Sequence, residues 1–352
     1  MNVELIIYDE NLNRIGLIEE FSSLLWTRKY YEPGNFQLVL PMTPRNVSYI
    51  QEGRILRKIG SKEAGVVEYI KMDDKPKSKT MTVKGRFLSS YMDRRLLKGT
   101  LKFSGKSEIA MRTCLTTADP IPLVELGDLM GYEDKIVMQV TYKDLLETMK
   151  KLSKQSGHGF RFTPDFVNKK IYFDIYDGLD RSMNQFDRNR VVFSDEYLNL
   201  NDVSYTTTST LYKNVFYIAG EGEGEDRKII TIGDTDASGL NRREVFIDAR
   251  DLQKGDLTDE EYEELLISRG LEKQSSYFRS ESFDSTVNPM VNFKYMTDYD
   301  LGDIVTISKS AWGKTKNLRI TEIMEQHTKG SMQIVPTFGD PIPELNWSEM
   351  NE

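Results

Sequence analysis

Residues 26–41 have the sequence WTRKYYEPGNFQLVLP, and this stretch says most about the fold. Its second half, residues 36–40, alternates large apolar side chains with other residues at a period of two, which is typical of a β-strand with one face in a core. Pro41 ends the run, because proline cannot donate a hydrogen bond to a sheet. Pro33-Gly34 fits the centre of a tight turn, so the stretch predicts two strands joined by that turn.

The residues around this hairpin continue the strand pattern. Residues 3–7 and 66–70 are further strand candidates, and residues 75–78 are predicted to form a tip before a returning strand at 81–83. Several short strands at this spacing, without a long helix, are typical of a small barrel or sandwich. The first hundred residues are therefore predicted to form a β unit.

Three helices are predicted farther along the chain. Residues 107–117 form one candidate, which the prolines that follow would end. Residues 141–155 form another, with apolar residues on one face, Thr141 and Asp144 as a capping box and Gly157 as the stop. Thr258 and Glu261 indicate the start of the third. Strands are predicted between and after these helices, at residues 160–162, 171–176, 203–207, 215–219, 228–232, 291–295, 304–307, 318–324 and 332–335.

The composition excludes several classes of chemistry. The chain has 352 residues, 47 Lys and Arg, 55 Asp and Glu, two His and one Cys. These counts rule out an internal disulfide, a Cys₂His₂ zinc site and a His₃ metal site. A histidine-dependent hydrolase would have to use His158 or His327. We interpret His158 as part of a helix stop and His327 as a turn residue, and we predict no catalytic residue, no cofactor and no metal site.

Two loops resemble ligand-binding motifs only in part. Residues 234–239 look like the first half of a calcium loop, but the position that requires a bidentate Glu holds Val245. Residues 220–226 are rich in glycine, as phosphate cradles are, yet their acidic residues would repel a phosphate. The sequence therefore predicts a polar turn and a flexible acidic loop tip.

The N-terminus and the hydropathy favour a protein that stays in solution. No stretch approaches the ~20 apolar residues of a membrane span, and the first residues lack the pattern of a signal peptide. We expect synthesis in a cytoplasm and no stable membrane insertion.

Charge is distributed unevenly along the chain. Residues 54–106 hold 15 Lys or Arg and 5 Asp or Glu, a local charge of +10, whereas residues 219–264 hold 6 and 15, a local charge of −9. Two solvated faces would explain this pattern, as would nucleic-acid contact by the basic segment, which contains no recognised nucleic-acid motif. The third interpretation is head-to-tail association, in which the basic region of one copy faces the acidic region of the next.

The stretch 26–41 resembles the N-terminal signature of bacteriophage and prophage tail-hub proteins, in which an aromatic strand with an Arg is followed by Glu-Pro-Gly and a second strand. Further matches follow in the order of that family and span about the whole chain. They are residues 65–68, 85–88, 93–95, 178–182, 192–194, 212–215, 220–222 and 302–305.

The resemblance implies an α+β, mainly β fold, with two barrel-like β domains and helix-containing domains between them, as in the phage tail-hub fold. We expect an N-terminal barrel-like domain over residues 1–100 and an α+β domain over 101–195. A second barrel-like domain over 196–240 and 283–345 would hold an inserted helical segment at 241–282.

The resemblance also implies a role in assembly rather than catalysis. Such hubs form a trimeric ring in a virion tail, at the baseplate or tail tip, where they connect the tail tube to the tip and surround the path of DNA. Expected partners are further copies of the chain and the distal tail, tube and tip proteins, with DNA passing nearby without sequence-specific binding. Candidate subunit-interface or lumenal residues, chosen for their clustering, are Arg54, Arg57, Lys58, Arg86, Arg94 and Arg95.

Two alternatives remain open. A carbohydrate-binding or cell-wall-degrading tail component could stack Trp26, Trp312 or Trp347 on sugar rings. A nucleic-acid binder would use the basic segment. Many relatives carry a C-terminal enzyme or fibre, whereas this sequence ends at Glu352, so we expect such a part to be a separate protein.

Overall fold

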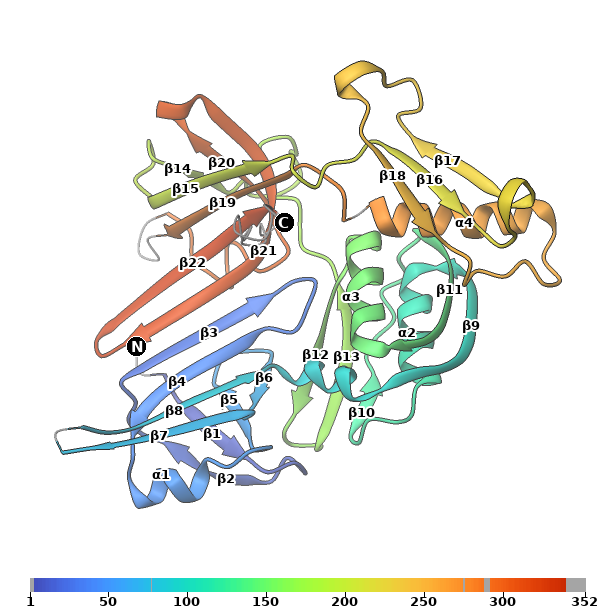
Figure 1. The fold of residues 1–352 in the computed structure, drawn as a ribbon. Helices are drawn as coiled ribbons and strands as arrows, with labels where there is room; N and C mark the ends of the chain where they lie inside the picture. Colours follow the sequence, from blue (N-terminus) through green and yellow to red (C-terminus); the bar gives the residue numbers. More distant parts are fainter. Residues whose placement is uncertain (1–2, 77, 275, 288–291, 340–352) are drawn as a thin grey trace. The chain divides into compact units, whose positions relative to one another are not determined.

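The computed structural model describes residues 3–76, 78–274, 276–287 and 292–339 (Figure 1). The chain forms two compact units. Unit 1 consists of Met1–Asp177, Lys213–Tyr277 and Gln326–Met332, and unit 2 consists of Gly178–Tyr212, Phe278–Glu325 and Gln333–Glu352.

Unit 1 begins with two antiparallel sheets. The first has the order β2-β1-β5-β6, from Arg14–Ile18, Leu5–Tyr8, Ile55–Lys58 and Ala64–Val66. In the second, β3 (Ser23–Lys29) pairs with β4 (Asn35–Pro41), which pairs with β8 (Ser78–Arg86), which pairs with β7 (Tyr69–Lys75). Helix α1, Pro44–Tyr49, follows β4. The β7–β8 hairpin confirms the returning strand predicted at residues 81–83 (Figure 1). The strand predicted at residues 66–70 was wrong in its bounds, because Val66 ends β6, β7 begins at Tyr69, and the two residues between them belong to no strand.

The predicted hairpin of residues 26–41 is present. Phe36, Leu38 and Leu40 of β4 are at most 2% exposed, as their alternation predicts. A side chain at Gly34 would place its Cβ 2.2 Å from the carbonyl oxygen of Thr27. Only glycine fits there, which explains physically why the two strands are joined by a Pro-Gly segment.

The middle of unit 1 packs two helices with further strands. The 3₁₀ helix η1 (Leu88–Arg94) and the strand β9 (Leu96–Lys106) precede helix α2, Ser107–Thr117. The predicted bounds of α2 are confirmed. Strands β10 (Val124–Leu126), β13 (Lys170–Tyr176) and β12 (Gly159–Asp165) form one sheet. Strand β11, Lys135–Asp144, pairs with β9.

The predicted start of the second helix was wrong. Residues 141–144 lie in β11, where Thr141 pairs with Thr100, and α3 spans Leu145–Ser156. Its N-cap is Asp144, whose carboxylate accepts a hydrogen bond from the Glu147 amide at 2.8 Å. Gly157 ends the helix at a φ of +82°, as predicted. Pairing with β9 outweighs the local helical pattern at the first turn.

The last part of unit 1 is a small sheet covered by a helix. Strands β17 (Ile229–Gly233), β16 (Val215–Ala219) and β18 (Glu244–Asp248) pair in that order, and the turns η2 (Gly224–Asp226) and η3 (Gly239–Asn241) lie between them. Helix α4, Asp259–Gln274, packs Leu265 and Leu266 against this sheet. The predicted capping box is confirmed, because the Thr258 amide donates to Glu261 and the Glu261 amide donates to Thr258.

Unit 2 consists mainly of strands. Its elements are β14 (Val192–Ser194), β15 (Leu200–Thr208), β19 (Ser280–Val287), β20 (Ile304–Lys309), η4 (Ser310–Trp312) and most of β21 (Lys314–Thr328) and β22 (Ser331–Gly339). The end of β21 and the start of β22, within Gln326–Met332, belong to unit 1. The order β15-β19-β22-β21 forms a sheet, and β20 pairs with β21 and β14.

The strand predicted at residues 291–295 was wrong in its described part. Val291 lies outside the described residues, and from Asn292 to Tyr295 the structure has only an isolated bridge at Tyr295. Strand β19 was not predicted. Its polar sequence, SESFDSTV, gives a weak local signal, and pairing with β15 and β22 fixes it instead.

The α+β, mainly β class is confirmed by these elements. The predicted domain boundaries, at residues 100, 195, 240, 282 and 345, stay predictions.

Candidate functional site

Three of the predicted basic residues lie on or beside β5. Arg54 is half-buried and donates to the Gln51 side chain at 3.3 Å. The Arg57 guanidinium lies over the Phe166 ring, 4.5 Å from its centroid. Lys58 is only 6% exposed. The surface of unit 1 therefore presents Arg54 and part of Arg57, whereas Lys58 belongs to the interior.

Arg86, at the end of β8, is held by two acids. Its guanidinium contacts Glu68 at 2.8 Å and Asp93 at 2.6 Å. The hydrogen bond to Glu68 raises the pKa of Arg86 against the opposing effect of burial, and Asp93 adds to it. Arg86 is 43% exposed, so one part of its surface remains accessible.

Arg86 also faces a hollow of about 320 Å³ that the sequence did not predict. Glu32 and Pro33 of the Glu-Pro-Gly motif line it, together with Lys150 on α3. Burial alone would raise the pKa of Glu32, but a hydrogen bond from Lys29 and the charges of Lys29 and Lys150 lower it. Two segments that the resemblance singled out separately thus meet at one place.

The remaining two basic residues lie at the end of η1. The Arg94 guanidinium is stacked 4.4 Å from the centroid of the Tyr91 ring and is exposed. Arg95 donates to the carbonyl oxygens of Asp119 at 3.1 Å and Pro120 at 3.0 Å. Arg94 is therefore available to another molecule, and Arg95 serves in part to hold its own chain.

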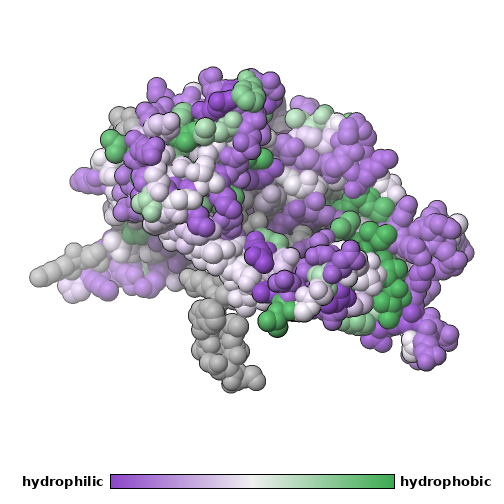
Figure 2. All heavy atoms as spheres, turned by 90° about the horizontal axis from the view of Figure 1, so that it is seen from above, coloured by the Kyte–Doolittle hydropathy of each residue, from purple (hydrophilic) through white to green (hydrophobic). Residues whose placement is uncertain are grey.

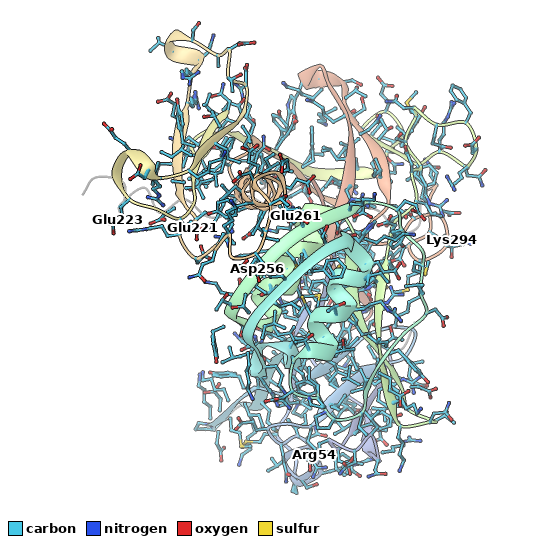
Figure 3. The ribbon with its side chains drawn as sticks, turned by 90° about the vertical axis from the view of Figure 1, so that its right-hand side faces the viewer. Arg54, Glu221, Glu223, Asp256, Glu261 and Lys294 are labelled. Atoms are coloured by element: carbon cyan, nitrogen blue, oxygen red, sulfur yellow. The ribbon has the colours of Figure 1, made fainter. Side chains whose placement is uncertain are left out.

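The acidic segment gathers at one end of unit 1. Glu221, Glu223, Asp256 and Glu261 lie in the part of the molecule around α4, at about mid-height in the view, whereas Arg54 lies at its bottom (Figure 3). Basic residues of the segment pair with acids of the same segment, for example Arg227 with Asp248 at 2.6 Å. Because the segment holds 15 acidic and 6 basic residues, such pairing cannot neutralise it.

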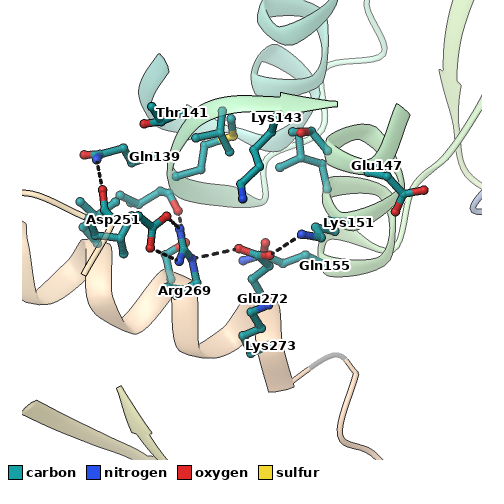
Figure 4. Close-up of a pocket in the computed structure, with 18 of the residues that line it drawn as sticks. Gln139, Thr141, Lys143, Glu147, Lys151, Gln155, Asp251, Arg269, Glu272 and Lys273 are labelled. Carbon is teal, nitrogen blue, oxygen red and sulfur yellow. Dashed lines mark hydrogen bonds and ion pairs between the residues drawn. The ribbon is translucent and has the colours of Figure 1, made fainter. Parts of the chain in front are cut away.

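A pocket with a volume of about 620 Å³ lies between β11, α3 and α4 (Figure 4). A chain of ion pairs crosses it, from Asp251 to Arg269 at 2.9 Å, on to Glu272 at 3.3 Å and from there to Lys151 at 3.4 Å. The amide of Gln139 donates to the Asp251 carbonyl oxygen at 3.1 Å. These contacts fix α4 against β11 and leave a hollow with both apolar and charged walls.

His158 has an environment that the sequence did not reveal. Its two ring nitrogens lie 2.6 Å from Asp177 and 2.6 Å from Asp134, and its ring stacks on Tyr132 at 4.0 Å. Burial alone would lower the pKa of His158, but the two carboxylates raise it above 6.5. The helix-stop interpretation holds for Gly157, and the imidazole additionally joins the loop before β11 to the end of β13.

The other singled-out residues occupy structural positions. His327 was predicted in a turn, but it lies in β21 and is 5% exposed. Burial raises the pKa of the Cys114 thiol to about 12. Trp26 is fully buried and cannot stack on a sugar, Trp312 is 45% exposed, and Trp347 lies outside the described residues. The tryptophan pattern therefore gives no sugar-binding platform at Trp26.

Residues 234–239 form the expected turn. The Arg242 guanidinium donates to the carbonyl oxygens of Thr235 and Ala237 at 2.9 and 3.0 Å. A cation would meet that positive charge in the same loop. Among the described residues, no group of three or more His, Cys, Asp or Glu side chains is arranged to hold a metal ion. Within the same part of the chain, no helix is long and apolar enough to cross a membrane.

Exposed apolar side chains form a second kind of candidate surface. In the face shown in Figure 2, hydrophilic residues predominate and apolar residues gather in a few places. Leu129 and Met130, in the loop before β11, are 60% and 56% exposed. Neither residue was predicted from the sequence, although a Leu-Met pair inside a Gly- and Asp-containing loop is a signal of an exposed apolar surface.

Known tail proteins share this fold. The tail protein from Neisseria meningitidis MC58 superposes with a TM-score of 0.62 at 10% identity, covering 97% of each chain. The 43 kDa tail protein of prophage MuSo2 from Shewanella oneidensis gives 0.61 at 13% identity, covering 95% of this chain and 98% of that one. Prophage tail protein gp18 from Listeria monocytogenes EGD-e gives 0.57 at 13% identity, with 99% and 97% covered.

At sequence level the match is to a family. No curated protein matches the sequence. The family model described as Siphovirus ReqiPepy6 Gp37-like protein matches residues 4–340, which is nearly the whole chain. The resemblance to phage tail proteins is thereby confirmed, and the chain belongs to the Siphovirus ReqiPepy6 Gp37-like protein family.

Proposed function

We propose that this tail protein is a structural hub at the baseplate or tail tip, and that three copies form a ring that connects the tail tube to the tip and surrounds the path of DNA. The β-rich parts of each copy form barrel-like domains in the wall of that ring. The protein performs no reaction. It is made in the host cytoplasm and becomes part of the virion tail, in contact with tube, distal tail and tip proteins.

Membership of the tail-protein family and the fold shared with three tail proteins support a structural role in a tail. The observation that carries the ring is the charge polarity of unit 1. Arg54 lies at the bottom of the view, and the labelled acidic residues near α4 lie well apart from it, at about mid-height (Figure 3). A surface with opposite charges at two ends favours a heterologous, head-to-tail contact, and such contacts close into rings.

The candidate contact residues differ in their exposure. Arg94 is exposed, whereas Arg54, Arg57, Arg86 and Arg95 are half-buried and keep part of their surface accessible. Lys58 is buried, so the proposal rests on the other five. A guanidinium group among these five that lies in the lumen of the ring, and not in the subunit interface, would contact DNA phosphates independently of sequence.

Native mass spectrometry of the purified chain tests the ring. We expect a species of three times 40.7 kDa that dissociates as ionic strength rises. The paired variant Arg94→Glu with Arg95→Glu should shift the equilibrium toward monomer. Arg188→Glu, which reverses an exposed charge in unit 2, is the matched control and should leave the trimer intact.

Two results would overturn the proposal. One is that the wild-type chain and the paired arginine variant form equally stable trimers, which would show that these arginines form no charged subunit contact. The other is an electron-microscopy image of the assembled tail tip without a threefold ring of this protein, which would remove the hub.

A further inference from the structure

In the loop between β10 and β11, two large apolar side chains project into solvent. Leu129 and Met130 are 60% and 56% exposed, and the preceding Leu126 is 36% exposed. Single exposed apolar residues are common on proteins, whereas neighbours in one loop often mark a contact surface. We call residues 126–130 the apolar loop.

The backbone next to these side chains is fixed by a buried carboxylate. Glu108 of α2 is 1% exposed. Its oxygens accept hydrogen bonds from the amides of Met130 at 2.7 Å, Gly131 at 2.8 Å and Tyr132 at 3.3 Å. Hydrogen bonds to a charged acceptor are the strong ones, so this half of the loop is held in one conformation.

The other half is fixed from the next turn of the same helix. Arg112 donates to the carbonyl oxygens of Gly127 at 2.8 Å and Asp128 at 3.2 Å. Residues four apart lie on one face of a helix, so both side chains of α2 reach the same segment. The Glu108 carboxylate accepts hydrogen bonds from its backbone amides, and the Arg112 guanidinium donates to its backbone carbonyl oxygens. A side chain at Gly127 would place its Cβ 2.4 Å from an oxygen of Asp174, so the loop is also pressed against β13.

A fixed conformation matters because binding costs the entropy of ordering a surface. Apolar side chains on a pre-organised backbone have already lost much of that freedom before a partner arrives. The charges of Glu108 and Arg112 thus serve to present Leu129 and Met130 outward, where no contact within the described part of unit 1 buries them. The structure of the loop favours a protein partner with an apolar hollow.

Unit 1 itself carries such a hollow, the pocket between β11, α3 and α4. Its volume of about 620 Å³ lies in the range of roughly 300–1,000 Å³ that is usual for binding pockets. The walls include buried apolar side chains from all sides, namely Met138, Leu152, Leu252 and Leu265. Two aliphatic side chains fit such a volume.

The charges of the hollow complement the apolar loop. Asp251 and Glu272 are paired with Arg269 across the pocket. Of the other acids that line it, Asp144 caps α3, Glu147 pairs with Lys150, and Asp248 pairs with Arg227 and Arg250. Lys143 extends into the pocket from β11 and Lys273 lies at the end of α4 (Figure 4). Their ammonium groups suit Asp128, the exposed acid beside Leu129.

We propose that the apolar loop of one copy inserts Leu129 and Met130 into the β11–α3–α4 pocket of a second copy, with Asp128 facing Lys143 and Lys273. The contact is heterologous, because the loop and the pocket are different surfaces of one unit, so it is compatible with a ring. The proposal rests on the hub ring as proposed above and names the surfaces that would meet in it.

Disulfide trapping tests the contact directly. Met130→Cys and Lys143→Cys in one chain should form covalent multimers under mild oxidant on a non-reducing gel. The native Cys114 is buried and its thiol pKa is raised to about 12, so it contributes little reaction. Leu240→Cys with Lys143→Cys is the matched control, since Leu240 is 99% exposed and lies outside the loop. A cross-linking yield equal to that control overturns the proposal.

Serine and charge variants give a second readout. Leu129→Ser with Met130→Ser should raise the dissociation constant of the oligomer about tenfold or more, the effect of losing an interface hot spot. Val167→Ser with Leu240→Ser removes similar exposed apolar surface and should leave it unchanged. Asp128→Lys and Lys143→Glu should each weaken association, and the two together should restore it.

These outcomes separate the contact from the hub. If the wild-type chain is a trimer, the serine variant is also a trimer and the cysteine variant forms no disulfides, the contact is overturned and the hub stands. Disulfides trapped in the cysteine variant, together with images of the wild-type protein that show no threefold ring, support the contact and overturn the hub.

Discussion

The interior of residues 1–177 and the surface around α4 use the same charged residue types in opposite ways. Arg28 and Glu63 form an ion pair at 3.0 Å with exposures of 1% and 3%. Lys254 and Asp259, beside α4, pair at 2.7 Å with exposures of 36% and 78%. A buried ion that loses its partner remains uncompensated, whereas an exposed one is solvated by water. Charge therefore fixes the fold in the first region and remains available for association in the second.

Among the variants that test this comparison, Arg28→Met should have the largest effect on the free energy of unfolding. It leaves the Glu63 carboxylate buried without the ion pair, so the free energy of unfolding should fall by about 3–5 kcal/mol, measured by urea denaturation. Arg45→Met is the matched control, because Arg45 pairs with Glu19 at 3.1 Å on the surface, with exposures of 49% and 59%. Equal effects of the two variants would contradict the contrast between buried and exposed charge.

Glu108→Gln should have the next largest effect. The amide keeps the shape of the side chain but offers a neutral oxygen to three backbone amides. We expect a loss of about 1.5–3 kcal/mol, the worth of hydrogen bonds to a charged group. Hydrogen exchange should become faster at Met130, Gly131 and Tyr132. Unchanged exchange at these amides would show that the carboxylate does not hold the loop.

Thr258→Ala probes the α4 side of the comparison. The hydroxyl accepts from the Glu261 amide at 3.2 Å, and its loss should cost about 1 kcal/mol, as for other N-caps. The effect should be local, with faster hydrogen exchange in the first turn of α4 and none in β1 to β8. Destabilisation that spreads equally through the β sheets would contradict it.

The smallest effect should be visible as a pH dependence. The pKa of His158 is raised in the folded state, so the stability that its imidazolium gives is full below about pH 6.5 and is lost as the pH rises through the folded pKa. Asp134, Asp177 and Tyr132 face the ring, and Tyr30 donates to Asp177 at 3.2 Å.

His158→Gln should flatten this slope between neutral and alkaline pH. The two histidines of the chain give two imidazole signals in a proton NMR titration, and the signal missing from the variant belongs to His158. A titration midpoint of the His158 signal at or below pH 6.5, the ordinary pKa of histidine, would show that the two carboxylates do not stabilise the imidazolium.

Local sequence was sufficient where local physics decides. The bounds of α2, the Thr258–Glu261 capping box, the Gly157 stop and the alternation of β4 were all predictable, because each depends on residues within one turn or one strand. The first turn of the predicted second helix and strand β19 failed, because pairing with β9 and with β15 and β22 decides them. His327 was assigned to a turn for the same reason, since the length of β21 is set by its sheet.

The candidate surfaces divide in a similar way. The uneven charge of residues 54–106 and 219–264 was countable from sequence, but the burial of Lys58 and the pairing of Arg86 with Glu68 and Asp93 were not. The apolar loop depends on Glu108 and Arg112, which lie 15 to 24 residues before the carbonyls and amides that they bind. No local pattern encodes that meeting.

By itself, the sequence determined that this chain is a mainly β protein with too few histidines and cysteines for most metal or thiol chemistry, and it identified the Siphovirus ReqiPepy6 Gp37-like protein family. Only the tertiary structure decided which charges are buried, that His158 is held between two aspartates, and that Leu129 and Met130 point outward. The reason is physical. Composition and short-range periodicity are properties of neighbours in the chain, whereas burial and ion pairing depend on which distant segments the fold brings together.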